Sequence, residues 1–188
     1  MNRRQTMIGV FAAVAALQLA VPLSMIAKRE LTLREGVAFK FRTAPVDPYD
    51  AFRGRYVALQ VEEANHQATN AAAFESGQWA YALLDNDAGG FARIRQVVAD
   101  RPAKGEFIKT RVQYANGSTL TLQCPFDRYY LPEQIAPEAE KAYWSHSNRT
   151  NRNAYVVVRV RSGFAALESL FVDDLPIIEY VRQHGQQP

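Results

Sequence analysis

The sequence predicts a mainly β domain, an antiparallel sandwich or partly closed barrel with one or two short helices, preceded by a single N-terminal transmembrane helix. Apolar and polar residues alternate along several short stretches, which is the period of half-buried strands. Turn-forming residues separate these stretches about every ten residues, as in sandwiches and small barrels. An uncharged apolar run stands near the N terminus. We therefore divide the 188 residues into a membrane anchor with basic flanks at 1–29 and an exported β-rich domain at 30–188.

The anchor is predicted from the run between Met7 and Ala27, which contains 21 residues and no charge. A helix of this length spans roughly 31 Å at about 1.5 Å per residue, which matches the hydrocarbon core of a bilayer. A cleaved signal peptide is the alternative, because Arg3 and Arg4 supply a basic leading segment. However, Met25 places a long side chain where a cleavage site needs a small one. We expect an uncleaved single-pass anchor in the cytoplasmic (inner) membrane, with the domain on the periplasmic or extracytoplasmic side.

The distribution of charge argues against a nucleic-acid partner. The chain has 22 basic and 19 acidic side chains, a net charge of +3 and an isoelectric point of about 9.1. Residues 1–29 contain four of the basic side chains and no acid, whereas residues 30–188 contain 18 basic and 19 acidic side chains. A surface that follows phosphates needs clustered Lys and Arg. Here the excess flanks the apolar run, so we expect a lipid bilayer and no nucleic acid as partner.

The stretch from Pro45 to Val61 is the most strongly patterned part of the domain. Asp47 can cap a helical turn, and Pro48 fits the first helical position because it has no N–H to lose. Gly54 can end that turn with a positive φ. From Tyr56 onward the side chains alternate as in a half-buried strand. The stretch is therefore interpreted as a structural turn that leads into a strand, with a ligand site as the alternative.

The other elements follow from alternation and turn residues. Asn116-Gly117 is a strong signal for a two-residue hairpin, and Pro137 opens a short helix. Residues 62–76 favour a loop over a short alanine-rich helix. The predicted strands lie at Leu31–Phe41 (a hairpin or bulged strand), Tyr56–Val61, Trp79–Leu83 with Phe91–Val98, Phe107–Tyr114 with Thr119–Gln123, and Tyr155–Val160 with Ala165–Val172, before an edge segment at Pro176.

The string DPYDAFRGRYVALQV resembles the signature of the GDYXXLXY protein family, membrane-anchored bacterial proteins of unknown biochemical function. Gly54, Tyr56 and Leu59 match the signature. Arg55 stands where the family has Asp, and Val61 stands where it has the final Tyr. The charge at position 55 is therefore reversed relative to the family pattern.

Two further segments extend this resemblance over almost the whole chain. RYYLPE, from Arg128 to Glu133, is similar to a family segment of the form R-Y-F-V-P-E, and residues 163–172 are similar to its closing hairpin. The resemblance implies a domain encoded beside, or fused to, multi-spanning membrane proteins. A protein of that kind is the expected partner.

Arginine and tyrosine in the two motif segments form the candidate partner-binding surface, because both side chains combine contact area with directed hydrogen bonds. We expect the Tyr56 strand and the Arg128–Glu133 loop to lie side by side. The alternative is an ion pair between Arg128 and Glu133 that pins the loop to the sheet. The candidate partner-binding residues are Arg53, Arg55, Tyr56, Arg128, Tyr129 and Glu133.

No metal site or cofactor is predicted. Asp85 and Asp87 resemble the start of a calcium loop, but Gln96 stands where a bidentate acid is required, so a hairpin turn is expected. The histidines lack the spacing that brings two imidazoles to one metal. These isolated histidines are His66, His146 and His184.

No catalytic residue is predicted either. The single cysteine, Cys124, lies in the apolar string LTLQCPF and is expected to be a buried small residue. Ser24 faintly resembles the serine of membrane-bound signal peptidases, but no lysine stands in a matching motif. We expect a non-enzymatic accessory domain of the bacterial cell envelope that contacts a membrane protein. The alternative is an envelope hydrolase, signal-peptidase-like or other, with an unrecognised active site.

Overall fold

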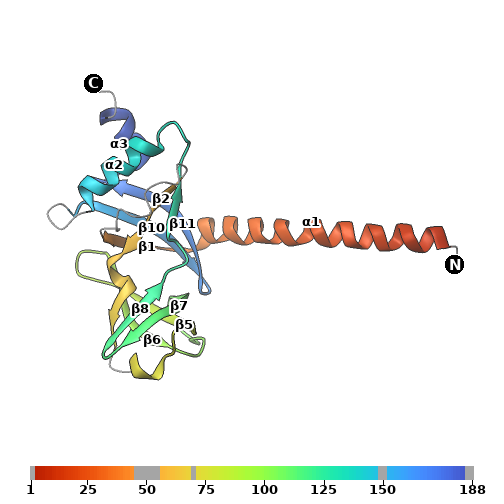
Figure 1. Ribbon diagram of the computed structural model, residues 1–188, viewed down its shortest axis with the longest axis horizontal. Helices are drawn as coiled ribbons and strands as arrows, with labels where there is room; N and C mark the ends of the chain where they lie inside the picture. The colour runs from red at the N-terminus through yellow and green to blue at the C-terminus, as the bar shows by residue number, and fades with distance from the viewer. Residues whose placement is uncertain (1–2, 45–55, 69–70, 148–151, 185–188) are drawn as a thin grey trace.

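The structure of the protein is a computed structural model that describes residues 3–44, 56–68, 71–147 and 152–184. Within these ranges the predicted fold class is confirmed: an antiparallel β domain with short helices follows one long apolar helix (Figure 1). The helices and strands are α1 (Arg3–Glu35), β1 (Val37–Ala44), β2 (Tyr56–Ala58), β3 (Gln60–Val61), β4 (Asn65–Gln67), β5 (Trp79–Asn86), β6 (Ala92–Val98), β7 (Phe107–Asn116), β8 (Thr119–Gln123), β9 (Arg128–Tyr130), α2 (Ala136–His146), β10 (Ala154–Arg161), β11 (Phe164–Val172), β12 (Leu175–Pro176) and α3 (Ile177–His184).

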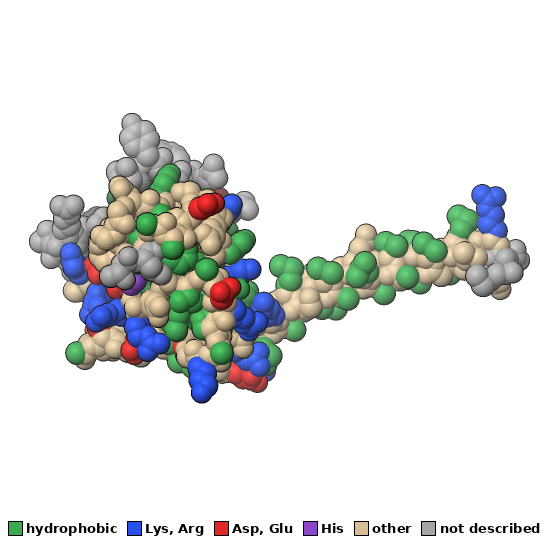
Figure 2. Space-filling view, turned by 90° about the horizontal axis from the view of Figure 1, so that it is seen from below, with side chains coloured by type: hydrophobic (Ala, Val, Ile, Leu, Met, Phe, Trp, Pro, Cys, Tyr) green, Lys and Arg blue, Asp and Glu red, His purple; other side chains and the backbone are tan. Residues whose placement is uncertain are grey.

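Helix α1 projects from the domain (Figure 1). Its apolar side chains are exposed along its length (Figure 2). It contains the predicted span from Met7 to Ala27 and is long and apolar enough to cross a membrane. Thr32 is the one buried residue among the described residues of the helix. The domain therefore contacts the end of α1 and leaves the apolar part uncovered.

The prediction that a strand or hairpin begins at Leu31 is wrong, because α1 continues to Glu35. An ion pair of 2.8 Å between Arg34 Nε and Glu30 Oε1, one helical turn apart, supports the extension. Gly36 ends the helix: its N–H donates to the Thr32 carbonyl at 2.9 Å, and a Cβ atom at this position would collide with the same oxygen. Strand β1 then starts at Val37.

The strands form two five-stranded antiparallel sheets and one two-stranded ladder within the described residues. The predicted hairpins β5–β6, β7–β8 and β10–β11 are all present. Pro176 lies in the edge strand β12 as expected, but the following residues form helix α3, which the sequence analysis missed. The orders are β12-β11-β10-β1-β3 in the first sheet, β4-β8-β7-β5-β6 in the second sheet and β2-β9 in the ladder.

One apolar core extends through both sheets. Phe41 from the first sheet and Ile108 and Leu120 from the second are fully buried members of the same cluster. Phe126, which precedes β9, lies against Phe41 with a ring-centroid distance of 5.1 Å. The segment that leads into the β2–β9 ladder is therefore fixed by the core from which that ladder emerges.

Two contacts join the sheets near different ends of β1. In the first, Lys109 N–H of β7 donates to the Gly163 carbonyl at the tip of the β10–β11 hairpin at 3.0 Å. In the second, Arg42 Nη1 of β1 donates to Asp87 Oδ2 in the β5–β6 turn at 2.8 Å. We call these the hairpin contact and the arginine contact.

Candidate functional site

The two motif segments pair as neighbouring strands, as the sequence analysis predicted. Strands β2 and β9 are antiparallel, with Tyr56 opposite Tyr130 and Ala58 opposite Arg128. Val57, which lies between Tyr56 and Ala58 on β2, is buried. Because successive side chains of a strand point to opposite faces, Tyr56 lies on the face turned away from the core.

That outer face carries an aromatic and cationic cluster. The Tyr56 and Tyr130 rings are 5.7 Å apart, and Arg128 Cζ lies 5.1 Å from the centroid of the Tyr56 ring. Tyr130 is 68% exposed. A hydrogen bond with Tyr130, followed by the negative charge of Asp127, raises the pKa of Arg128. The cluster therefore presents a permanent positive charge beside two tyrosine rings that contact each other.

The remaining predicted site residues separate from this cluster. Tyr129 is half-buried and packs against the core, on the opposite face of β9. Glu133 is exposed. The alternative ion pair between Arg128 and Glu133 is absent from the described residues, where the acidic neighbour of Arg128 Nε is Asp127 Oδ1 at 3.9 Å. Outside the described residues lie the candidates Arg53 and Arg55 and the predicted turn residues Asp47, Pro48 and Gly54.

A groove of about 490 Å³ extends from β9 toward the end of α1. Residues 125–130, which include Arg128 and Tyr130, line one side of it, and Arg29 of α1 and residues 164–168 of β11 line the rest. Glu168 in this wall is already neutralised, because Arg159 Nε lies 2.6 Å from its Oε2. The groove thus connects the second motif segment to the residues that follow the apolar part of the helix.

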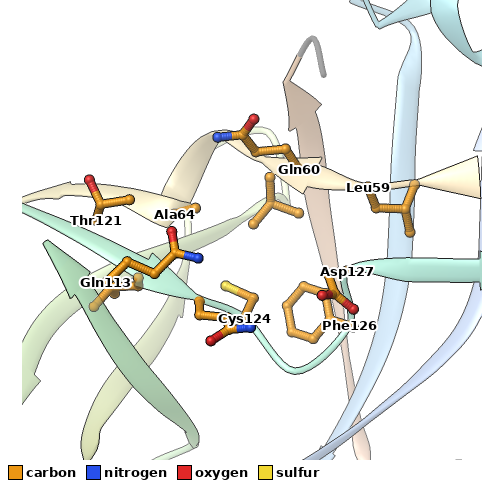
Figure 3. Close-up of a pocket in the computed structure, with 11 residues that line it drawn as sticks. Leu59, Gln60, Ala64, Gln113, Thr121, Cys124, Phe126 and Asp127 are labelled. Carbon is orange, nitrogen blue, oxygen red and sulfur yellow. The ribbon is translucent and has the colours of Figure 1, made fainter. Parts of the chain in front are cut away.

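A smaller pocket of about 280 Å³ lies where β3, β7 and β8 approach the start of β9 (Figure 3). Leu59, a residue of the first motif segment, lines it, and its N–H donates to the Asp127 carbonyl at 2.8 Å. Figure 3 shows Cys124 between Gln113 and Phe126. Cys124 is buried as predicted, and burial raises the pKa of its thiol to about 12. The thiol is therefore protonated at neutral pH.

Comparison with protein families matches residues 18–170 to the model of the GDYXXLXY protein. The chain belongs to the GDYXXLXY protein family. The match covers most of the chain and includes both strands of the β2–β9 ladder. Neither the curated proteins nor the solved structures contain a match. The matched region therefore contains both motif segments on which the resemblance was based.

A cluster around His146, at the end of α2, was not predicted. Nδ1 lies 2.8 Å from both Ser145 Oγ and the Ala142 carbonyl, and Nε2 lies 3.0 Å from Asp173 Oδ2. The Tyr180 hydroxyl of α3 is 3.5 Å from Nε2. Ser145 Oγ also donates to the Ala142 carbonyl at 2.9 Å. The cluster closes the last turn of α2 and connects that helix to α3, which begins beyond the region matched by the family model.

The predicted hairpin turn at Asp87 is confirmed. Asp87 Oδ1 accepts from the N–H groups of Gly89 and Phe91 at 2.8 and 2.9 Å, and Oδ2 accepts from Arg42. The Arg42 hydrogen bond, followed by that of the Phe91 N–H, lowers the pKa of Asp87.

Among the described residues, no histidine lies in a metal site. Burial is the largest cause of the lowered pKa of His66. The part of the chain that the structure describes contains no group of three or more His, Cys, Asp or Glu side chains able to hold a metal ion.

Proposed function

We propose that the protein is a membrane-anchored, non-enzymatic accessory component of the bacterial cell envelope that acts by contacting a multi-spanning membrane protein. Residues Met7 to Ala27 form an uncleaved anchor in the inner membrane, and residues 30–188 form the exported domain. The observation that carries this proposal is the β2–β9 ladder, which exposes Arg128 and Tyr130 beside a groove that reaches Arg29.

The chemistry of the ladder supports a protein contact. Arginine and tyrosine are enriched among the residues that contribute most to protein interfaces. Tyr130 is largely exposed. Arg128 lies over the Tyr56 ring and forms a hydrogen bond with Tyr130, so ordering these side chains on binding costs less conformational entropy. The cluster therefore has the composition of an interface hot spot.

The position of the groove supports a partner within the membrane. Arg29 follows the predicted span by two residues, so in the inserted protein it lies at the membrane surface. The groove that contains Arg29 continues to Arg128 and Tyr130. A loop that leaves the bilayer at this level can contact the anchor end and the ladder together.

Site-specific photo-crosslinking in the full-length, membrane-inserted protein tests the proposal. A photoreactive amino acid at Tyr130 should give an adduct with an integral membrane protein, identified by mass spectrometry. Tyr114 is a matched control, because it is also 68% exposed but lies on β7, outside the groove. Arg128→Ala and Tyr56→Ala should reduce the Tyr130 adduct severalfold and leave the melting temperature nearly unchanged.

Two outcomes contradict the proposal. Equal adducts at positions 114 and 130 would show that the ladder is not a preferred contact. A fall of many degrees in the melting temperature of both variants would show that the cluster is a structural clamp. The topology is checked separately by sequencing the mature N terminus and by a C-terminal reporter that is active only outside the cytoplasm. A mature protein that starts near Lys28 would exclude the anchor.

A further inference from the structure

A second pocket, of about 370 Å³, lies where the end of α1 meets β5, β7 and the β10–β11 hairpin. Its volume is within the range of small-ligand sites. Lys28 of α1, Trp79 of β5, Lys109 of β7 and Phe164 of β11 line it. We call it the anchor pocket. Trp79 is 56% exposed, although large aromatic side chains are usually covered.

The anchor pocket is positively charged and lacks an acidic wall. Lys28, Arg101 and Lys109 contribute three cations, and no Asp or Glu is among the described residues that line it. None of these three cations forms an ion pair within the part of the chain that the structure describes. Figure 2 shows Lys and Arg side chains, together with some Asp and Glu side chains, around the junction of helix and domain. The charge of the pocket is therefore available to an anion.

Lys28 and Lys109 each contact an aromatic ring. Lys28 Nζ lies 4.5 Å from the centroid of the Phe164 ring, and Lys109 Nζ lies 4.4 Å from the Trp79 ring. Arg101 Nη2 donates to the Ser162 carbonyl at 3.3 Å. A cation–π contact positions an ammonium group but does not neutralise it. An incoming phosphate can therefore form charge-assisted hydrogen bonds with the same groups.

The pocket also lies at the depth of lipid headgroups. Lys28 directly follows Ala27, the last residue of the predicted span, and the headgroup layer extends roughly 5–8 Å beyond the hydrocarbon core. Exposed tryptophan is enriched at this interface because its ring is apolar and its N–H is polar. A basic site at this depth faces a high local concentration of phosphodiesters.

We propose that the anchor pocket binds the headgroup of an anionic phospholipid of the membrane that contains α1. Lys28 and Lys109 contact the phosphate, Arg101 adds the third positive charge, and Trp79 packs beside the glycerol region. The proposal rests on the membrane insertion of α1 in the proposed function, but it does not depend on the partner contact at the β2–β9 ladder.

Fluorescence quenching of Trp79 in lipid nanodiscs tests this assignment. Trp144→Phe in the full-length chain leaves Trp79 as the one tryptophan. The quenchers are phosphatidylglycerol and phosphatidylcholine, each spin-labelled near the carbonyl end of the acyl chain. We expect stronger quenching by phosphatidylglycerol, with a preference that falls about fivefold in Lys28→Gln and in Lys109→Gln, the value of one basic residue at an anionic surface.

Matched variants distinguish a specific headgroup site from a general attraction between basic side chains and anionic lipids. Lys141→Gln removes an exposed lysine of α2 outside the pocket and should keep the preference, as should Lys109→Arg, which retains the charge. Arg128→Ala should also keep it, because Arg128 does not line this pocket. Melting temperatures of all variants verify that each one is folded.

Several results would overturn the inference. Equal quenching by the two lipids, or an equal loss in Lys141→Gln, would show that there is no headgroup site. Inorganic phosphate that abolishes the preference at millimolar concentration would assign the pocket to free phosphate. Quenching by neither lipid would place Trp79 away from the lipid interface and would contradict the headgroup site, whereas the anchor is tested separately by the sequence of the mature N terminus. An absent Tyr130 adduct with an intact lipid preference would contradict the partner contact alone.

Discussion

The hairpin contact and the arginine contact join the same two sheets through different physical interactions. At the hairpin contact, Gly163 takes a φ of +86°, and a Cβ atom there would lie 2.5 Å from Phe107 Cε2. At the arginine contact, Arg42 pairs with Asp87 and lies 3.9 Å from the Phe91 ring. The first contact depends on backbone conformation and close packing, and the second on charge in a partly exposed setting.

This difference indicates which of the two contacts can change in strength with pH or salt. Close packing around a backbone hydrogen bond responds little to pH or salt, whereas a partly exposed ion pair is screened and titrates. The insensitive contact is also the one beside the anchor pocket, since Ser162, Gly163 and Phe164 line that pocket. The basic anchor pocket thus has a wall whose packing does not itself rely on charge.

Gly163→Ala should have the largest effect on stability. The substitution forces a positive φ on a residue with a Cβ and pushes that atom into Phe107, at a combined cost of about 2–5 kcal/mol. Thermal unfolding should show a decrease of roughly 5–15 °C in the melting temperature of the folded protein. Gly105→Ala is the matched control, because Gly105 has a φ of +87° but nothing within 4 Å of the added atom. Equal decreases in both variants would show that backbone conformation, and not packing, dominates the hairpin contact.

The rate at which Cys124 is alkylated should report whether the hairpin contact limits transient opening of the core. Burial raises the pKa of the Cys124 thiol to about 12, so at pH 8 only about one molecule in 10⁴ carries the reactive thiolate. Iodoacetamide should modify the native protein more than a hundredfold more slowly than the protein in denaturant. Gly163→Ala should accelerate the native reaction at least tenfold, because more molecules open transiently. Rapid modification of the native wild type would mean that Cys124 is accessible.

Asp87→Asn should have the smallest effect, and that effect should depend on pH. Hydrogen bonds from Arg42 and from the Phe91 and Gly89 N–H groups lower the pKa of Asp87 below its usual 3.8. A lowered folded-state pKa gives a stability contribution that is present above about pH 4 and is lost as the pH falls through the folded-state pKa. The difference in melting temperature between wild type and Asp87→Asn should therefore be small at pH 7 and shrink further below pH 4.

Asp100→Asn is the control for the removal of a carboxylate, because Asp100 is exposed and outside every ion pair of the described residues. If the Asp87→Asn difference is constant from pH 7 to pH 3, the arginine contact is not electrostatic and the contrast between the two contacts is lost.

Local patterns explain why much of the fold was predictable. Asn116-Gly117 and Ser162-Gly163 sit at hairpin turns, with positive φ values at Gly117, Ser162 and Gly163. Alternation located the strands on either side of these turns because the side-chain period of a strand is a property of a few consecutive residues. The same locality misled at Leu31 and Leu33, since two leucines at a spacing of two fit a strand and also fit the helix that extends to Glu35.

The candidate site was predicted only where sequence segments carry family motifs. The sequence determined by itself that an uncharged apolar helix precedes a β domain, that Cys124 is buried, and that Tyr56 and Arg128 belong to one surface. The tertiary structure alone decided that Lys28, Trp79 and Lys109 meet in the anchor pocket. These residues lie on three different elements, and their proximity depends on how the β10–β11 hairpin packs against β7. Hydrophobic periodicity and turn residues determine structure among neighbouring residues. The proximity of Lys28, Trp79 and Lys109 depends instead on contacts between residues that are distant in the chain.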